Sequence, residues 1–201
     1  MNASLMILDM QQGIVRSSRI PWESPDIPDL AIRSAGLLLD AARRLRIPVI
    51  HVGVVRSFTK GIFDEPRTQA AARSGKVPRE ILPMISMSKE VEFVLPPVEG
   101  EEIVHKGGVS AFAGTRAEPL LRNLGVRDVF VFGAFTHMVV ESTVRDGFDR
   151  GFHMHVIADA CCAPAKALHE SALNTGIPNF ACILNDSKSA ITAWETGAKA
   201  S

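Results

Sequence analysis

The sequence predicts an α/β protein with a three-layer αβα architecture around a doubly wound, mainly parallel sheet of six strands. Six short apolar runs, rich in β-branched residues, recur along the 201 residues, and segments with helical spacing lie between them. Most of these runs do not alternate between apolar and polar residues, as a strand with one solvent-exposed face does. This indicates strands that are buried on both faces. Strands that alternate with helices favour a parallel sheet. We therefore expect a single domain spanning residues 1–201.

The elements can be placed from the apolar runs and from the residues that end them. The first expected helix ends in several arginines, which suit a helix C-terminus, before a proline that cannot continue it. A glycine, the residue that most readily ends a helix, follows each of the other three. The expected strands are 5–8, 49–55, 102–105, 129–132, 153–158 and 180–184, and the expected helices are 30–45, 115–124, 136–150 and 165–174, the last three followed by Gly125, Gly151 and Gly176.

One stretch, residues 56–100, departs from this alternation. It is rich in proline and predicts only a short helix near 68–73. Long segments of this kind inside a compact domain are usually functional. We therefore expect it to form an excursion over the active cleft.

The composition excludes several classes of partner. The chain has 22 basic and 22 acidic residues, so there is no electrostatic footprint for nucleic acid or an anionic membrane. Its N-terminus enters the first strand without a targeting pattern, and no apolar segment approaches the roughly 20 residues of a membrane span. Three cysteines, two of them adjacent, suit neither a disulfide framework nor a CxxC metal site. We expect a cytoplasmic protein with a small-molecule partner and no cofactor.

Residues that could take part in catalysis follow three of the expected strands. Ligands of such sheets bind beyond the carboxyl ends of the strands. Asp9 follows the first strand and is either a general acid/base or a cap for the next turn. Lys106 follows the third strand and either takes part in chemistry or extends to solvent. After the fourth strand and Gly133, Thr136 can cap a helix whose first turn contains Val139. N–H groups at such a helix start can stabilise an oxyanion.

Together these blocks resemble the isochorismatase-like, or cysteine hydrolase, superfamily, which includes nicotinamidases, carbamoylsarcosine amidases and isochorismatases. The blocks lie at the ends of four strands, in the order that the family has them, and the resemblance covers nearly the whole chain. They are Leu8-Asp9-Met10-Gln11, His105-Lys106-Gly107 with Ser110-Ala111-Phe112, Gly133-x-x-Thr136-His137-x-Val139-Val140-Glu141-x-Thr143-x-Arg145-Asp146, and Asp159-Ala160-Cys161.

The resemblance implies a role for each matched residue. In members with a catalytic cysteine, the residue at the position of Val139 is the nucleophile, and the residue matching Asp9 accepts its proton. The residue matching Lys106 holds both in their charged forms. The resemblance also implies a cis peptide between Ala134 and Phe135, and an oxyanion hole made by the N–H groups of Phe135 and Val139.

Val139 departs from the family pattern because valine has no nucleophilic atom. A covalent thioester cannot form at this residue. The groups that remain available for catalysis are Asp9, Lys106 and the backbone N–H donors. Isochorismatases have glycine at this position and cleave a vinyl ether with the aspartate and a water, but the valine side chain would crowd such a water.

Three interpretations therefore stand. The first is a noncovalent hydrolase acting on an isochorismate-type vinyl ether or a small amide or imide. The second is a catalytically silent member that binds a small ligand or serves as an assembly subunit. The third is an ordinary cysteine hydrolase in which Val139 is an engineered substitution.

Other residues are candidates by position, and each is also explained by packing. Phe112 is favoured for pocket contact because it lies in a matched block, whereas the Thr136 hydroxyl is favoured as a helix cap. On the helix after Val139, residues 145, 146 and 150 are expected on its wet face or in a subunit contact. The pocket candidates are Gln11, Trp22, Phe112, Ala134, Phe135, Thr136 and His137.

Neither a replacement thiol nor a metal is expected. Cys161 and Cys162 follow the fifth strand and are interpreted as small buried residues, and Cys182 as core. His51 lies inside the second strand, and we expect it to be a buried histidine with a hydrogen-bond partner rather than a metal ligand. The Asp-x-His metal pattern of nicotinamidases is absent, and residues 56–60 occupy its place. In that stretch, Arg56 and Lys60 either receive an anionic substrate or lie in a solvated loop.

By analogy with the family, we also expect the protein to form a homodimer or a larger homo-oligomer.

Overall fold

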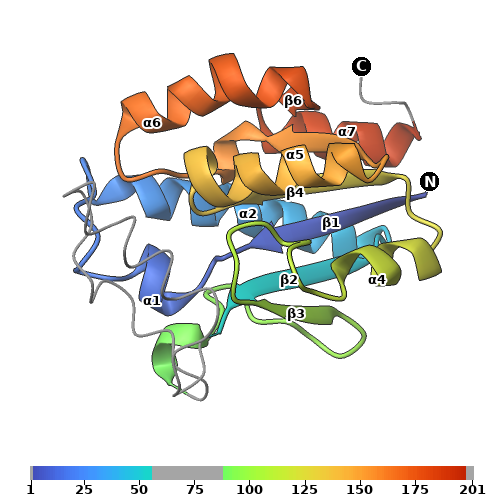
Figure 1. The fold of residues 1–201 in the computed structure, drawn as a ribbon, viewed down its shortest axis with the longest axis horizontal. Coiled ribbons are helices and arrows are strands. Elements are labelled where there is room, and N and C mark those ends of the chain that lie inside the picture. The colour runs from blue at the N-terminus through green and yellow to red at the C-terminus, as the bar shows by residue number, and fades with distance from the viewer. Residues whose placement is uncertain (1, 56–87, 198–201) are drawn as a thin grey trace.

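The computed structural model describes residues 2–55 and 88–197, and its centre is a fully parallel six-stranded sheet. The strand order β3-β2-β1-β4-β5-β6 reverses direction between β1 and β4 (Figure 1). All six strands were predicted to within two residues. They are β1 (Ala3–Leu8), β2 (Val49–Val54), β3 (Glu102–Lys106), β4 (Asp128–Gly133), β5 (His153–Ile157) and β6 (Ala181–Leu184).

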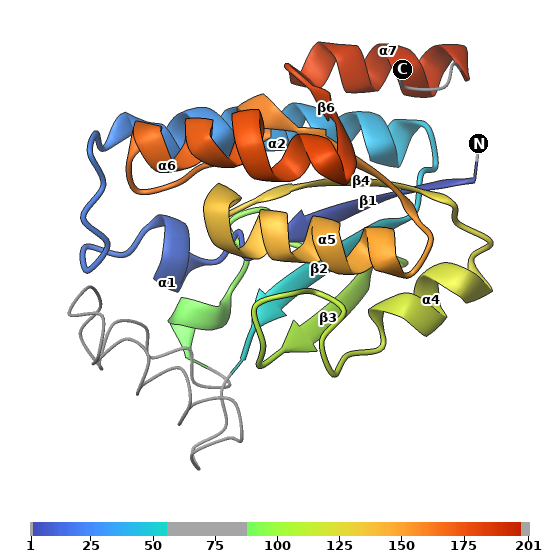
Figure 2. The same ribbon diagram turned by 45° about the horizontal axis from the view of Figure 1, so that its top comes forward.

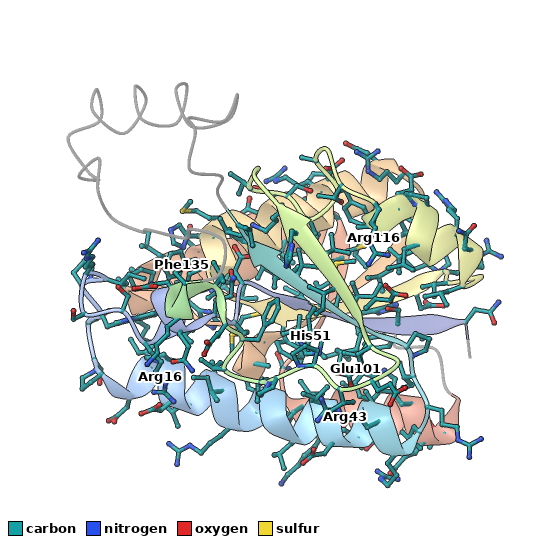
Figure 3. The ribbon with its side chains drawn as sticks, turned by 90° about the horizontal axis from the view of Figure 1, so that it is seen from below. Arg16, Arg43, His51, Glu101, Arg116 and Phe135 are labelled. Atoms are coloured by element: carbon teal, nitrogen blue, oxygen red, sulfur yellow. The ribbon has the colours of Figure 1, made fainter. Side chains whose placement is uncertain are left out.

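Helices cover both faces of the sheet, as the predicted αβα layering requires. Helices α2 (Asp26–Arg44) and α7 (Ser187–Thr196) pack together on one face, and α4 (Ala117–Asn123) and α5 (Glu141–Asp149) lie on the other (Figures 2 and 3). Every residue of β1 and β2 is buried, which explains their continuous apolar sequences. No helix in the described ranges is long and apolar enough to cross a membrane.

Two expected helices are interrupted. The helix predicted at 136–150 starts with a π-helical turn, Thr136–Val140, before α5. The helix predicted at 165–174 consists of α6 (Lys166–Ser171), a π-helical turn at Ala172–Gly176 and a 3₁₀ turn at Ile177–Asn179.

The glycines after the expected helices have different functions. Gly125 and Gly151 adopt the left-handed conformation of a helix end, as predicted, with φ of 67° and 78°. Gly176 does not, because its φ is −78° and the chain continues in a helical turn. A Cβ on Gly176 would lie 2.3 Å from Oε1 of Glu141, so this glycine instead makes room for a carboxylate.

Two helices were not predicted. Helix α1 (Gln12–Val15) is too short to show a periodic pattern. Helix α7 does carry terminal signals in the sequence: the Asp186 carboxylate accepts a hydrogen bond from the Ser189 N–H at 2.7 Å, and Gly197 ends the helix with φ of 65°.

The end of β4 lies unusually close to the end of β1. Gly133 has φ of 144°, and a Cβ on it would lie 1.9 Å from the carbonyl oxygen of Leu8, its register partner. Only glycine is compatible with this approach. The next residue, Ala134, donates its N–H to the Leu8 oxygen at 3.0 Å. The turn after β4 is therefore held beside Asp9.

An ion-pair network ties α2 to the strands at the β3 edge. The Glu101 carboxylate accepts hydrogen bonds from Arg43 Nε at 2.7 Å, from His51 Nε2 at 2.9 Å and from the Val98 N–H at 3.0 Å (Figure 3). Burial alone would raise the pKa of Glu101, but these donors outweigh it and hold the pKa at about 2. Burial lowers the pKa of His51, which was correctly predicted to be a buried histidine with a hydrogen-bond partner.

Replacing Glu101 by glutamine should lower the free energy of unfolding at pH 7 by about 1.5–3 kcal/mol, because hydrogen bonds to a buried charge are lost. The pKa of Glu101 falls from its ordinary 4.5 to about 2 on folding, so its contribution is complete above pH 4.5 and disappears as the pH falls through 2. The difference between wild type and Glu101→Gln, measured by urea unfolding at pH 7, 4.5 and 3, should therefore shrink toward acid.

The control is Glu195→Gln, which removes an exposed ion pair with Arg44 and should change stability by less than about 1 kcal/mol. Equal effects of the two substitutions at pH 7 would contradict the assignment.

Candidate active site

Asp9 lies where the strand order reverses, directly after β1. Its N–H donates to the Val52 carbonyl at 2.8 Å, and its own carbonyl accepts the Gln11 N–H at 2.8 Å. The residue has φ of 53°, a conformation that aspartate tolerates better than most residues. Its side chain is only 2% exposed. The structure thus places a buried carboxylate at the crevice where ligands of such sheets bind.

Lys106, the last residue of β3, turns inward rather than to solvent. Its side chain is fully buried, and Nζ donates to Oδ2 of Asp9 at 2.8 Å and to the Gly108 carbonyl at 3.3 Å. Its register partner is Val54 of β2, so the lysine reaches past β2 to a residue that follows β1. The pairing of Asp9 with Lys106 was implied by the family resemblance, and the solvent-exposed alternative for Lys106 is wrong.

The loop after Lys106 is anchored to α5 by side chains. Ser110 Oγ donates to Oδ2 of Asp146 at 2.7 Å, and the Ala111 N–H donates to Oγ1 of Thr143 at 3.0 Å. Asp146 was expected on a wet face or in a subunit contact, but its carboxylate holds this loop instead. Thr143 lies in a block that matches the family, but no function was predicted for it. The available signal was their spacing, because residues three apart share one face of a helix.

The turn after β4 contains the cis peptide between Ala134 and Phe135 that the resemblance implied. The N–H groups of Val139 and Val140 both donate to the Phe135 carbonyl, at 2.9 and 3.2 Å. The Phe135 N–H, in contrast, takes no part in these helical hydrogen bonds and lies at the isolated parallel bridge between Ala134 and Cys162. Of the two expected oxyanion donors, Phe135 is therefore the one whose N–H is not already used by the helix. Val139 itself is 5% exposed and belongs to the hydrophobic core.

Two of the pocket candidates have structural partners. The Gln11 amide is fully buried and donates to the carbonyls of Val54 and Val91, at 3.1 and 2.8 Å, while its oxygen accepts the Val54 N–H at 2.8 Å. It therefore joins β2 to the 3₁₀ turn Lys89–Val91. Thr136 does not cap the helix as expected: its hydroxyl is hydrogen-bonded to Nδ1 of His169 at 2.8 Å.

Phe112, the favoured pocket residue, packs away from solvent against α5 and the segment that connects α5 to β5. Its ring stacks on Phe152 with centroids 5.8 Å apart, the Arg150 guanidinium lies 5.5 Å from its centroid, and a Cβ on Gly147 would approach it to 3.0 Å. These contacts give Phe112 a packing function. Ala134 is buried and hydrogen-bonded to β1, whereas Phe135 and His137 are partly exposed.

The thiols are poorly suited to replace a nucleophile. Cys161 and Cys162 are buried, and burial raises the pKa of the Cys161 thiol to about 12 and raises that of Cys162 also. Cys182 was expected in the core but is partly exposed in β6.

Within residues 2–55 and 88–197, no group of three or more His, Cys, Asp or Glu side chains could hold a metal ion. Arg56, Lys60 and the expected helix at 68–73 lie outside the described residues.

Comparison with known proteins places the chain among relatives of one kind. The family model described as the isochorismatase domain matches residues 3–186. Nicotinamidase 3 of Arabidopsis thaliana is 26% identical over 187 residues, covering 92% of this chain and 86% of its own. Ureidoacrylate amidohydrolase RutB of Methylorubrum extorquens is 39% identical over 80 residues, or 39% of this chain and 32% of its own. A solved cysteine hydrolase from Pseudomonas syringae pv. phaseolicola has a TM-score of 0.79 at 21% identity, covering 97% and 93% of the two chains.

A double-mutant cycle on Asp9→Asn and Lys106→Met should show strong coupling. Each single substitution leaves one buried charge without its partner and should cost about 3–5 kcal/mol of unfolding free energy. The double variant should be more stable than the sum of the single effects predicts, by about 1–3 kcal/mol. Urea unfolding at pH 7 measures all four proteins.

The control cycle uses Arg116→Met and Glu102→Gln, an ion pair of the same 2.8 Å length whose side chains are 56% and 42% exposed. Its coupling should stay below about 1 kcal/mol. Additive effects of the Asp9 and Lys106 substitutions would show that the pair is not formed in solution.

Thiol titration should separate the three cysteines. At pH 8 an aromatic disulfide reagent should modify one thiol per folded chain, and Cys182→Ser should remove that reaction. The other two thiols should react only after unfolding in guanidinium, because both are buried. Rapid modification of Cys161 or Cys162 in the folded protein would contradict the structure.

Proposed function

The chain belongs to the isochorismatase family of hydrolases, and from this membership we propose that it hydrolyses a small molecule with a water activated at Asp9, without a covalent thioester. The observation that carries the proposal is the buried 2.8 Å contact between Lys106 Nζ and Asp9 Oδ2. Burying two charges is costly unless they are well paired, and a hydrophobic pair would serve stability as well. A role in proton transfer explains why both are present.

The chemistry can be followed atom by atom for an amide or imide. The substrate carbonyl lies against the Phe135 N–H, which stabilises negative charge as it develops on the oxygen. Asp9 accepts a proton from water, and the water oxygen bonds to the carbonyl carbon. The C–N bond then breaks, and Asp9 returns the proton to the leaving nitrogen. The Lys106 ammonium compensates the charge of Asp9 before and after the transfer.

A vinyl ether of the isochorismate type uses the same residues in the opposite order. Asp9 in its acid form protonates the terminal vinyl carbon, and water adds to the resulting oxocarbenium ion while its proton returns to Asp9. The C–O bond of the hemiketal so formed then breaks, the hydroxyl proton passes to the leaving oxygen, and a ketone and an alcohol are released. Both routes need Asp9 as proton carrier and Lys106 as its charged partner. Neither needs an atom of the Val139 side chain, which supports a noncovalent mechanism for this member.

A second function is favoured by Val139 itself. Its isopropyl group lies in the core at 5% exposure, beside the turn that carries the Phe135 N–H. If it excludes water from Asp9, the protein is a catalytically silent member that binds a small ligand or serves as an assembly subunit. Binding without turnover, in a protein with an intact Asp9–Lys106 pair, would distinguish this function from the first.

The proposal includes a cellular setting. We expect a cytoplasmic protein that forms at least a homodimer and binds neither nucleic acid nor membranes, consistent with its 22 acidic and 22 basic residues. Light scattering measures the assembly. A monomer at micromolar concentration would contradict the expected dimer.

A paired assay tests the catalytic proposal. The wild type is compared with Asp9→Asn on isochorismate and on a panel of amides, imides and ureas. Asparagine preserves the volume and tolerates the backbone conformation of Asp9, but it cannot carry the proton, so turnover should fall by about 10²-fold or more. Asp149→Asn, an exposed carboxylate on α5, is the control and should leave turnover unchanged.

Val139→Cys separates the two mechanisms. If this variant alone hydrolyses amides and loses that activity to iodoacetamide, and the wild type turns over nothing in the panel, isochorismate included, the wild type is a silent scaffold that has lost covalent chemistry. Turnover by the wild type that persists after iodoacetamide supports the water route. Undiminished turnover in Asp9→Asn would eliminate the proposal.

A further inference from the structure

The π-helical turn that follows Phe135 is coiled around a single carbonyl. Met138, Val139 and Val140 all donate their N–H groups to the Phe135 oxygen, at 3.1, 2.9 and 3.2 Å. π-Helical turns inside helices are frequent at functional sites. In this chain the turn begins directly after the residue whose N–H is the proposed oxyanion donor, so whatever fixes the turn also fixes that donor.

Thr136, the first residue of the turn, joins it to two other segments. Its N–H donates to the Cys162 carbonyl at 2.9 Å, and its hydroxyl is hydrogen-bonded to Nδ1 of His169 at 2.8 Å. Thr136 is fully buried, and across residues 2–55 and 88–197 this imidazole is the partner of its hydroxyl. A buried hydroxyl without a partner is costly, so the bond to His169 constrains the start of the turn.

His169 lies on α6, a helix that contributes no residue to the core. None of the α6 residues is buried, so apolar packing does little to fix its position. Its first N–H, that of Lys166, donates to the Glu23 carboxylate at 2.6 Å. Within the described part of the chain, His169 is the α6 side chain that bonds to a residue outside the helix. The position of α6 against the turn therefore depends on this imidazole.

The chain after α6 contacts the other end of the same turn. It forms the second π-helical turn, Ala172–Gly176, which packs on the first and lies next to α5 (Figures 1 and 2). There Gly176 lies so close to Glu141, the first residue of α5, that an added Cβ would meet its carboxylate. One segment, residues 166–176, thus holds the turn after Phe135 at both its start and its end.

The imidazole of His169 suits a bond of this kind. Burial lowers its pKa, with Glu170 opposing, so the ring is neutral near pH 7. In one neutral tautomer Nδ1 accepts the Thr136 hydroxyl, and in the other its N–H donates to the hydroxyl oxygen. The bond is therefore available without the burial of a charge.

We propose that His169 is a positioning residue for the hydrolysis: through Thr136, it holds the turn that presents the Phe135 N–H to the substrate carbonyl. His169 itself does not touch the substrate. An oxyanion donor lowers the barrier only if it is already in place when charge develops, and a small displacement of a positioned group is expensive in rate. This inference rests on the proposed function for the identity of the oxyanion donor.

Steady-state kinetics of the intact protein, on the amide that it hydrolyses best, test the positioning function. His169→Leu and Thr136→Val each remove the bond. Each should lower kcat by about five- to tenfold and change KM by less than about twofold, because the donor acts on charge that develops in the transition state. The double variant should be about as slow as either single variant, because all three proteins lack the same bond.

A conservative variant and a matched control separate positioning from stability. His169→Asn keeps a polar group near the place of Nδ1 and should keep kcat within about twofold of wild type. His155→Leu removes another histidine hydrogen bond, of 3.0 Å to Asp128, the first residue of β4. It should lower the melting temperature at least as much as His169→Leu, because His155 is more deeply buried, but leave kcat within about twofold of wild type.

Backbone NMR of the ¹⁵N-labelled protein gives a readout that needs no turnover. In His169→Leu the amide signals of Phe135 and Val139 should move, and hydrogen exchange at the Val140 amide should become about tenfold faster. In His155→Leu these three amides should be unchanged. The proposal is overturned if His169→Leu leaves the three amides as they are in wild type, or if His169→Leu and His155→Leu lower kcat equally.

These outcomes are separable from those of the catalytic proposal. A wild type that hydrolyses nothing in the panel would eliminate the hydrolysis, and the NMR comparison would then decide alone whether His169 positions the turn. Turnover that falls in Asp9→Asn but not in His169→Leu would leave the hydrolysis and remove the positioning function.

Discussion

The buried ion pair between Asp9 and Lys106 is the interaction on which the rest of the site depends. It joins the end of β1 to the end of β3 past β2, at 2.8 Å, with side chains that are 2% and 0% exposed. A pair in such surroundings is weak evidence for stability, because its desolvation offsets much of its attraction. In the proposed mechanism this pair transfers the proton, whereas Val139, which lies in the hydrophobic core, allows no covalent step.

Backbone and side-chain contacts hold this pair in place from two directions. The missing side chain of Gly133 lets β4 end against β1, so that the N–H of Ala134, the residue before Phe135, bonds to the carbonyl directly before Asp9. Thr143 and Asp146 fix the loop after Lys106 onto α5. Because α5 also continues from the turn that contains Val139, one helix positions both the charged pair and the expected oxyanion site.

The fold and the charged residues could be predicted from the sequence, but most of their supports could not. Apolar runs identify strands, and residues at the carboxyl ends of parallel strands share one edge, which located Asp9 and Lys106. The partners of Gln11, Thr136 and Phe112 depend instead on which segments become neighbours in three dimensions. Gln11 lies 43 and 80 residues from the carbonyls it binds, a relation that no local pattern encodes.

A single turnover in ¹⁸O-labelled water tests the central claim most directly, with the enzyme in excess over an amide that it hydrolyses. If Asp9 activates water, the product carboxylate contains ¹⁸O in the first turnover, and the peptide that contains Asp9 stays unlabelled in mass spectra. If Asp9 instead attacks the carbonyl and expels the amine, and water then opens the mixed anhydride at the Asp9 carbon, the first product is unlabelled and ¹⁸O appears in the Asp9 carboxylate. That second pattern would contradict the water mechanism and the function assigned to the Asp9–Lys106 pair.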